Sequence, residues 1–381
     1  MNENPKDFLK KCLELYSPSG NEIKYAIFLA NFLKQHGFKV KFDDIGNLIA
    51  EKGSGKPLLL MISHMDTIPG ELPVFEKEGK LYGRGAVDCK SALAAMVYAI
   101  SVYDFNKNPP GKIVFAGIVR EETSLEGILE FLKLDFKPDY AIFGEPTKTS
   151  QICIGYKGRL SLCYKIITKP GHIASSWMHL NAIEVALTIW EKIKEISRQF
   201  TGEVSSSSEV QKYYKKIVPN LSTIAGGELA NVIPSKCTIQ VDIRFPPSVN
   251  SNIILKHIRK SNSEIINAHS KQHPELKIQE EILSQIEGFE VKGDDILTGA
   301  LRWAIFKVRK SKPILVKKTG TTFINLIGNP YGIPSITYGP GDPKLEHSER
   351  EFVDIEEYLE TIEVYLKLFE KLQLNYSKTT S

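Results

Sequence analysis

The chain has 381 residues, of which 42% are hydrophobic and 25% charged, and its formal net charge is +4. A chain of this length can bury a large core and is expected to fold into two domains. The charge is mild and the basic residues are scattered rather than arranged in a stripe among aromatics, which speaks against nucleic-acid binding.

Membrane insertion and a disulfide framework are disfavoured on similar grounds. No apolar run approaches the ~20 residues that a membrane-spanning helix needs, and the charged start of the chain is unlike a signal peptide. The five cysteines are odd in number and form no Cys-x-x-Cys pair. We therefore expect a cytoplasmic protein that makes no contact with a membrane.

The first chemically informative element is a buried strand that ends in a histidine. The apolar run at residues 58–62 is typical of a parallel strand with both faces covered, and His64 closes it. Ligand sites in open α/β sheets gather where strands end. Asp66 follows two positions later and can hydrogen-bond the second ring nitrogen of His64, which would fix the nitrogen that faces a metal. Taken alone the pattern is weak, and a strand-end histidine with only a structural role is the alternative.

Further along the chain, a glycine-rich loop and three more strand-like runs lead into acidic residues or histidine. Asp88 lies in the glycine-rich loop, just before an apolar helical stretch at residues 92–100. The runs at 113–119, 140–144 and 334–339 lead, respectively, into Glu121 and Glu122, into Glu145, and into His347. Each acid taken singly could be a helix cap or a first-turn acid favoured by the helix dipole. Two histidines, one aspartate and three glutamates together predict a metal site.

The residue types in this set suit a pair of metal ions. A carboxylate can bridge two ions roughly 3.5–4 Å apart, and imidazole combined with carboxylate ligands suits zinc. Two ions that share a water lower its pKa towards ~7, yet another group must take the proton during attack on a carbonyl and return it to the leaving nitrogen. The adjacent Glu121 and Glu122 could divide the roles of ligand and base.

On these motifs, which extend along almost the whole chain, the sequence resembles the di-zinc aminoacylase and carboxypeptidase family. That family includes the succinyl-diaminopimelate desuccinylases and the acetylornithine deacetylases. The resemblance implies two Zn²⁺ ions per subunit, with Co²⁺ as an alternative metal. It implies five ligands, namely His64 and Glu145 for one ion, Glu122 and His347 for the other, and Asp88 as the bridge. It also implies that Glu121 is the general base and acid, that Asp66 belongs to the catalytic set, and that the peptide bond between Asp88 and Cys89 is cis.

Within this family, the sequence is most similar to the hydrolases that release lysine or ornithine from an amino-group carrier protein. The segments that carry this resemblance are 155–160, 318–321, 338–342, 345–347 and 355–365. One position departs from the pattern, because those enzymes tend to read Gly-Thr-Ser-Asp-Met-Asn where this chain has residues 320–325, and Phe323 replaces an acid. If that acid contacts the substrate amine, the substrate preference of this chain differs.

The reaction that this resemblance implies is the release of lysine or ornithine from the γ-glutamyl terminus of an acidic carrier protein, in lysine or arginine biosynthesis. Deacylation of acetylornithine, acetyl-lysine or succinyl-diaminopimelate is an alternative, as is cleavage of a dipeptide or a peptide C terminus. A protein of a different class, a binding module that kept the fold without turnover, is a further alternative. Glu121 argues against a binding module, because a pure binder needs no base beside its ligands.

The predicted fold is α/β, with a mostly parallel sheet in a catalytic domain that an insert interrupts. The catalytic domain is expected at residues 1–156 and 288–381. Residues 157–287 are expected to form an inserted α+β dimerisation (lid) domain of ferredoxin-like topology. Its predicted elements are a strand at 160–166, a helix at 181–196, strands at 221–225 and 237–245, a helix at 253–268 and a strand at 276–286. A helix at 297–309, a strand at 314–317 and a closing helix at 355–372 then resume the first domain.

The insert carries three candidate site residues of its own. The resemblance implies that His172 reaches the site of the neighbouring subunit in a homodimer and stabilises an oxyanion there, a task for a preplaced donor. It also implies that Asn231 and Arg244 hold substrate, and an arginine can grip a carboxylate with two parallel hydrogen bonds. The alternatives are an ordinary loop histidine at 172 and an ion pair of Arg244 with Asp242 or Glu228.

Lys157 and Arg159 are weaker candidates for substrate binding, through contact with an acidic carrier protein. An acidic protein substrate would meet this mildly basic chain faster, because complementary charge raises encounter rates.

Overall fold

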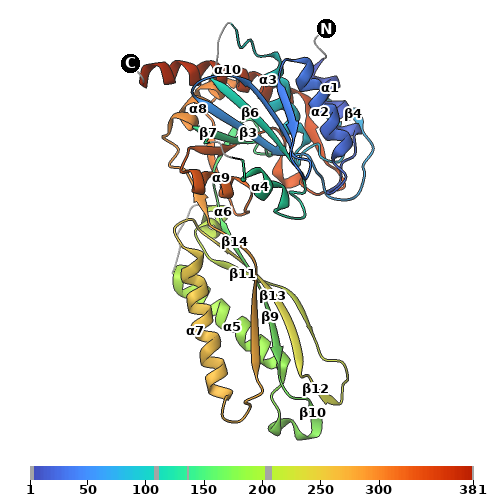
Figure 1. The fold of residues 1–381 in the computed structure, drawn as a ribbon, viewed down its shortest axis with the longest axis vertical. Helices are drawn as coiled ribbons and strands as arrows, with labels where there is room; N and C mark the ends of the chain where they lie inside the picture. The colour runs from blue at the N-terminus through green and yellow to red at the C-terminus, as the bar shows by residue number, and fades with distance from the viewer. Residues whose placement is uncertain (1–3, 107–110, 135–136, 202–207, 380–381) are drawn as a thin grey trace. The chain divides into compact units, whose positions relative to one another are not determined.

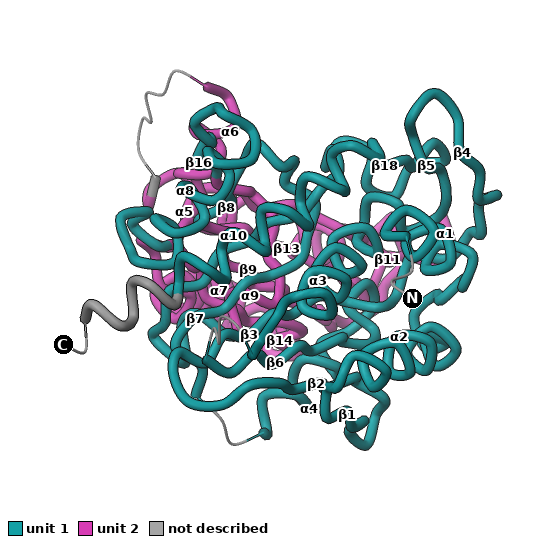
Figure 2. The backbone as a smooth tube through the Cα atoms, turned by 90° about the horizontal axis from the view of Figure 1, so that it is seen from above, with its two compact units in different colours: residues 1–154, 291–316, 327–381 teal, residues 155–290, 317–326 magenta. Residues whose placement is uncertain are grey.

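The computed structural model describes residues 4–106, 111–134, 137–201 and 208–379 (Figure 1). The chain divides into two compact units (Figure 2). Unit 1 comprises Met1–Ile154, Val291–Val316 and Ile327–Ser381, and unit 2 comprises Gly155–Glu290 and Lys317–Leu326. The segment Lys317–Leu326 was expected in the catalytic domain but belongs to unit 2. It groups with the insert because Thr321 and Asn325 donate side-chain hydrogen bonds to the carbonyl oxygen of Lys157.

A nine-stranded sheet belongs mostly to unit 1 and has the order β1-β2-β6-β3-β7-β17-β8-β15, with β16 paired to β8. By the division given above, β15 and the last two residues of β8 and of β16 belong to unit 2. Its strands are β1 (Lys39–Phe42), β2 (Leu48–Gly53), β3 (Leu58–His64), β6 (Lys112–Ile118), β7 (Tyr140–Phe143), β8 (Gln151–Tyr156), β15 (Phe289–Glu290), β16 (Ile314–Lys318) and β17 (Ser335–Thr337). The four central strands, β6, β3, β7 and β17, are parallel, and the pairings β1 with β2, β2 with β6, β17 with β8 and β8 with β15 are antiparallel. The parallel centre agrees with the predicted fold class, and the antiparallel flanks were not predicted.

The register of the central strands brings their carboxyl ends to one edge of the sheet. His64 at the end of β3 lies opposite Ile118 at the end of β6, and Thr337 at the end of β17 lies opposite Phe143 at the end of β7. Residues that follow these strands therefore emerge at the same edge, where ligand sites of open α/β sheets form.

Helix α3 (Lys90–Val102) organises the core of unit 1. Its residues from Lys90 to Ser101 are all buried, which is the pattern of a helix that is apolar on every side. It packs against β3 and β6 and against α1, α2 and α10. Because α3 begins two residues after Asp88, this packing fixes the position of the glycine-rich loop.

The remaining elements of unit 1 surround this core. The helices are α1 (Pro5–Glu14), α2 (Ile23–Gln35), α4 (Glu126–Phe131), α8 (Ile296–Arg309), α9 (Ile324–Tyr331), α10 (Ile355–Thr379) and the 3₁₀ helix η2 (Pro343–Leu345). A small sheet is formed by β4 (Phe75–Lys77), β5 (Lys80–Tyr82) and β18 (Phe352–Asp354). The closing helix α10 extends beyond residue 372, where its end was predicted.

Unit 2 has the topology of a ferredoxin-like sandwich. Its main elements follow one another as β9 (Gly158–Ile167), α5 (Ala182–Thr201), β11 (Val218–Gly226), β13 (Lys236–Phe245), α7 (Ser251–His269) and β14 (Lys277–Ile286). The sheet order is β11-β13-β9-β14, and all pairings are antiparallel. Alternate residues of β13 are buried, as expected for a sheet with helices on one face.

Shorter elements complete unit 2. They are β10 (Gly171–His172), the 3₁₀ helix η1 (Ile173–Met178), α6 (Glu209–Tyr214) and β12 (Val232–Ile233), and β10 pairs with β12. In the described residues of both units, no helix has the length and apolar character to cross a membrane. None of the five cysteines forms a disulfide, and all five are buried.

Candidate metal centre

Two groups of potential metal ligands lie at the carboxyl edge of the parallel strands, and they share one residue. His64, Asp88 and Glu145 form the first group, together with the sulfur of Cys89, and Asp88, Glu122 and His347 form the second. Within each group the ligand atoms lie within 4.8 Å of one another. All of these residues belong to unit 1.

Asp88 presents a different oxygen to each group. Its Oδ1 lies 3.0 Å from Nε2 of His64, and its Oδ2 lies 3.1 Å from Nε2 of His347. The same His64 nitrogen is 3.7 Å from Oε1 of Glu145, and the His347 nitrogen is 3.0 Å from Oε2 of Glu122. A carboxylate that faces two ligand pairs in this way has the arrangement required to bridge two ions.

The elements that carry these side chains explain how they meet. His64 ends β3, Glu145 follows β7 by two residues, and Asp88 lies in the loop just before α3. The peptide bond between Asp88 and Cys89 is cis, as the family resemblance implied. His347 follows η2 and has a φ of 60°, a left-handed conformation that few residues other than glycine adopt.

Asp66 has a broader role than the predicted orientation of His64. The closer partner of His64 Nδ1 is the backbone carbonyl of Asp66, at 2.9 Å, and the Asp66 carboxylate is 3.4 Å away. That carboxylate accepts the backbone N–H groups of Glu121 at 2.9 Å and Glu122 at 3.0 Å, and the Ser19 hydroxyl at 2.7 Å. Asp66 therefore holds the turn that presents the expected base and one expected ligand.

The electrostatics of the centre favour the binding of cations. Burial, and then the charges of neighbouring carboxylates, raise the pKa values of Glu121 and Glu122 to about 7. Burial also opposes ionisation of Asp88, but hydrogen bonds from His347 and His64 lower its pKa below the ordinary range. The hydrogen bond with Asp88 raises the pKa of His347 to about 9. Carboxylates outnumber imidazoles in the two ligand groups, so divalent cations would fit the donor set.

Cys89 lies beside the first ligand group but has the surroundings of a core residue. Burial raises the pKa of its thiol to about 12, so the sulfur stays protonated. It donates a hydrogen bond to the carbonyl of His64 at 3.3 Å and lies 3.0 Å from Oγ of Ser63. Because a metal ligand must be the thiolate, these contacts favour a small buried core residue over a metal ligand at this position.

The candidate residues of the insert lie in unit 2, separate in the chain from the ligands of unit 1. His172 is exposed at the end of β10, and its Nδ1 accepts the N–H of Ala174 at 3.2 Å. Asn231 is exposed just before β12. Arg244 makes the ion pair named as its alternative, with 2.6 Å between its Nε and Oδ1 of Asp242.

The prediction that Lys157 contacts an acidic carrier is wrong. Its side chain is 1% exposed, and its ammonium donates to the carbonyl oxygens of Tyr213 at 3.0 Å and Lys216 at 2.6 Å. Burial lowers its pKa to about 8. Lys157 therefore tethers the segment around α6 rather than facing solvent. Arg159 keeps 41% of its side chain exposed and pairs with Asp242.

A second carboxylate, which no sequence pattern indicated, supports the Arg120–Glu122 turn. Oε1 of Glu22 accepts the backbone N–H of Arg120 at 3.0 Å and that of Gly20 at 2.9 Å. Arg120 has a φ of 59°, so this hydrogen bond stabilises a conformation that is unfavourable for arginine. Glu22 is almost a hundred residues away in the chain, and no spacing rule links the two.

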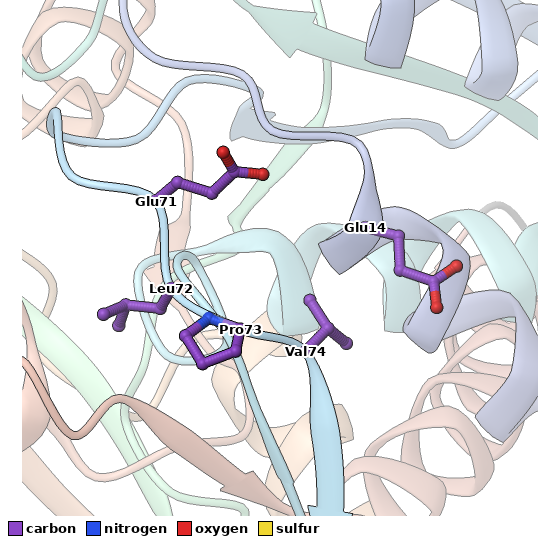
Figure 3. Close-up of a pocket in the computed structure, with 5 residues that line it drawn as sticks. All are labelled: Glu14, Glu71, Leu72, Pro73 and Val74. Carbon is purple, nitrogen blue, oxygen red and sulfur yellow. The ribbon is translucent and has the colours of Figure 1, made fainter.

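A hollow of about 400 Å³ lies on the loop that follows Asp66 and is lined by Glu14, Glu71, Leu72, Pro73 and Val74 (Figure 3). It contains none of the predicted ligands. The hollow is therefore separate from the two groups of potential ligands.

Comparison with known proteins identifies a family whose model matches most of the chain. The model of peptidase family M20/M25/M40 matches residues 60–371. A [LysW]-lysine/[LysW]-ornithine hydrolase of Sulfurisphaera tokodaii is 30% identical over 97% of this chain and 96% of its own length. A Pyrococcus furiosus protein, provisionally named for the same two activities, is 33% identical over 98% of each chain.

Solved structures share the fold. A tripeptidase of Staphylococcus aureus superposes with a TM-score of 0.79 at 21% identity, over 98% of this chain and 100% of that chain. An M20 family metallo-carboxypeptidase of Sulfolobus solfataricus gives a TM-score of 0.78 at 16% identity, over 98% and 100% of the two chains. At these identities the likeness concerns the fold alone.

Proposed function

This chain belongs to peptidase family M20/M25/M40, and on that basis we propose that it is a di-zinc hydrolase that releases lysine or ornithine from a carrier protein. The bond cleaved is the amide between the carrier's terminal γ-glutamyl group and the amino acid. The observation that carries the proposal is the sharing of Asp88 between two ligand groups. The names of the relatives support the choice of substrate.

The proposed ligand set uses every imidazole and carboxylate of the two groups and leaves out Cys89. His64 and Glu145 would hold one zinc ion, Glu122 and His347 the other, and Asp88 would lie between them. When bound, the two ions would polarise the scissile carbonyl and lower the pKa of a water molecule. Cobalt would suit the same nitrogen and oxygen donors.

Glu121 is the proposed proton carrier. Its carboxyl group lies close enough to Asp88 and Glu122 for their charges to raise its pKa, but it belongs to neither ligand group. In the proposed reaction it takes the proton of the attacking water and returns it to the leaving nitrogen. The Asp66 carboxylate keeps Glu121 in place by accepting a hydrogen bond from the backbone N–H of Glu121.

The residues of unit 2 complete the proposal. His172 would stabilise the oxyanion of the neighbouring subunit in a homodimer that unit 2 mediates, and its exposed imidazole is compatible with that role. Asn231 and Arg244 would hold the substrate. Asp242 engages Nε of Arg244, and the two terminal nitrogens remain suited to a carboxylate. Arg159 is proposed to face the acidic carrier.

A substrate panel tests the proposal. The zinc-loaded protein is assayed on an acidic carrier that bears γ-glutamyl-lysine or γ-glutamyl-ornithine, and on acetyl-lysine, acetylornithine, succinyl-diaminopimelate and dipeptides. We expect the highest kcat/KM on the carrier-linked substrates, with a decrease as salt rises, because rim charges act on association. The Glu121→Gln variant serves as the inactive control. A preference for the small acylated substrates would identify a deacylase instead, and no turnover at all would favour a binding module.

A further inference from the structure

Glu351 lies beside the metal centre without belonging to either ligand group. Its side chain is 1% exposed, and it immediately precedes β18. One carboxylate oxygen accepts the guanidinium of Arg84 at 3.1 Å and the backbone N–H of Gly85 at 3.0 Å. The other oxygen accepts the backbone N–H groups of Val87 at 3.0 Å and Asp88 at 2.9 Å. A single buried carboxylate thus receives four donors from the glycine-rich loop.

Two backbone hydrogen bonds lie within this loop, from the N–H of Ala86 to Gly83 at 3.1 Å and from the N–H of Lys90 to Gly85 at 2.9 Å. Gly85 has a φ of 85°, and a Cβ at that position would lie 2.9 Å from side-chain atoms of Thr67 and Lys90. The backbone of the loop is therefore neither helix nor strand and is tightly enclosed. The backbone N–H groups of Gly85, Val87 and Asp88 are paired instead with the Glu351 carboxylate, since buried N–H groups need acceptors.

Arg84 links Glu351 to the backbone beside His347 of the second ligand group. Its Nη1 also donates to the carbonyl of Ser348 at 3.0 Å, and its Nε donates to the carbonyl of Gly70 at 2.8 Å. Ser348 directly follows His347. The pair formed by Glu351 and Arg84 therefore connects the backbone that carries Asp88 with the backbone that carries His347.

We infer that Glu351 is a positioning residue that aims Asp88 at both metal ions and, through Arg84, fixes the turn of His347. The inference rests on the proposed di-metal function. Since residues that orient metal ligands typically contribute 10- to 100-fold to metal affinity, a loss of that size is expected when the carboxylate is removed. The affinity for both ions should decrease, because Asp88 is the proposed ligand of both.

The test measures metal binding rather than turnover. Metal-free wild type and Glu351→Gln are titrated with Co²⁺, followed by visible absorption and calorimetry, and the fold of each metal-free protein is checked by circular dichroism. Glutamine keeps the size of the side chain but offers only one acceptor oxygen. We expect two Co²⁺ ions in both proteins, with affinity 10- to 100-fold weaker for both ions in the variant. Glu349→Gln, an exposed acid two residues away, is the matched control and should bind like wild type.

Arg84→Lys provides a second variant, which decides the question if Glu351→Gln does not fold. Lysine keeps the charge but lacks the planar fork, so the contacts to Ser348 and Gly70 cannot both persist. We expect the affinity for the ion at Glu122 and His347 to decrease more than the affinity for the other ion. Co²⁺ affinities equal to wild type in the folded variants, with only a uniform decrease in Tm, would reduce Glu351 to a stability role and overturn the inference. Failure of the wild type itself to bind two ions would instead overturn the proposed function.

Discussion

Replacement of Asp66 by asparagine tests the turn that presents Glu121. The Asp66 carboxylate accepts two backbone N–H groups and the Ser19 hydroxyl, all at 2.7–3.0 Å. Burial opposes its ionisation, but the hydrogen bonds from His64, Ser19 and the Glu122 N–H lower its pKa, so the group is charged at neutral pH. An amide keeps the shape of the side chain but replaces one acceptor oxygen with a donor.

The cost follows from these contacts. A hydrogen bond to a charged group contributes about 1.5–3 kcal/mol, and a buried N–H left without an acceptor costs about 1–3 kcal/mol. In Asp66→Asn one N–H loses its partner and the other bonds lose their charge, so we expect the free energy of unfolding to fall by about 2–4 kcal/mol. Because displacement of a reacting group by about 1 Å can lower the rate about 100-fold, kcat should fall by about that factor.

The assay compares urea denaturation of the metal-free proteins with kcat of the zinc-loaded proteins. Asp139→Asn is the matched control, because Asp139 accepts the backbone N–H of Leu58 at the opposite end of β3. That variant should lose stability but keep kcat. If Asp66→Asn lost stability while kcat stayed at the wild-type value, the turn would not position the base, and the reasoning would be refuted.

Glu121→Gln should lower kcat by a factor of about 10² to 10⁴ while keeping two metal ions, whereas Glu122→Ala should lose one ion in metal analysis. Equal metal loss in both variants would contradict the division of roles. Metal binding should release protons, because ligands bind in their deprotonated forms. With pKa values of about 9 for His347 and about 7 for Glu122, these two groups should release about two protons at pH 6 and about one at pH 8. Calorimetry in buffers of different ionisation enthalpy measures this number, and a release that does not change with pH would count against the assignment. In the metal-free protein, Glu121 and Glu122 have pKa values of about 7, above their ordinary value of 4.5. The folded state then binds more protons than the unfolded state, so the free energy of unfolding should fall as pH rises from 4.5 to 7. Urea denaturation with a chelator checks this decrease, and a rise over the same interval would contradict it.

The strands of the central sheet could be predicted because their signal is local. Runs such as 58–62 and 113–119 are apolar throughout, as buried parallel strands are, and their carboxyl ends share one edge by topology. The insert could be predicted for a similar reason, since its strands and helices follow one another in a recognisable order. The strand β1 was not predicted because it is short, rich in lysine and largely exposed, and it lacks the apolar run of a central strand.

The contacts that support the centre could not be predicted from the sequence. Lys157 was expected at the surface because lysine is rarely buried, and its acceptors are backbone carbonyls more than fifty residues away. Glu22 and Glu351 are ordinary acids in the sequence, yet both accept backbone N–H groups of distant loops. Such contacts depend on three-dimensional proximity, and no periodic pattern in the sequence predicts them.

The five buried cysteines, none of which forms a disulfide, provide an intrinsic probe of local opening in each unit. Cys12, Cys89 and Cys153 belong to unit 1, and Cys163 and Cys237 belong to unit 2. A thiol reagent can modify each of them only when the surrounding structure opens, so the labelling rate of each cysteine, mapped by mass spectrometry, reports the free energy of that opening. Since Cys89 lies against the carbonyl of His64, its protection should increase when metal is bound, while Cys163 provides an internal reference within the same polypeptide.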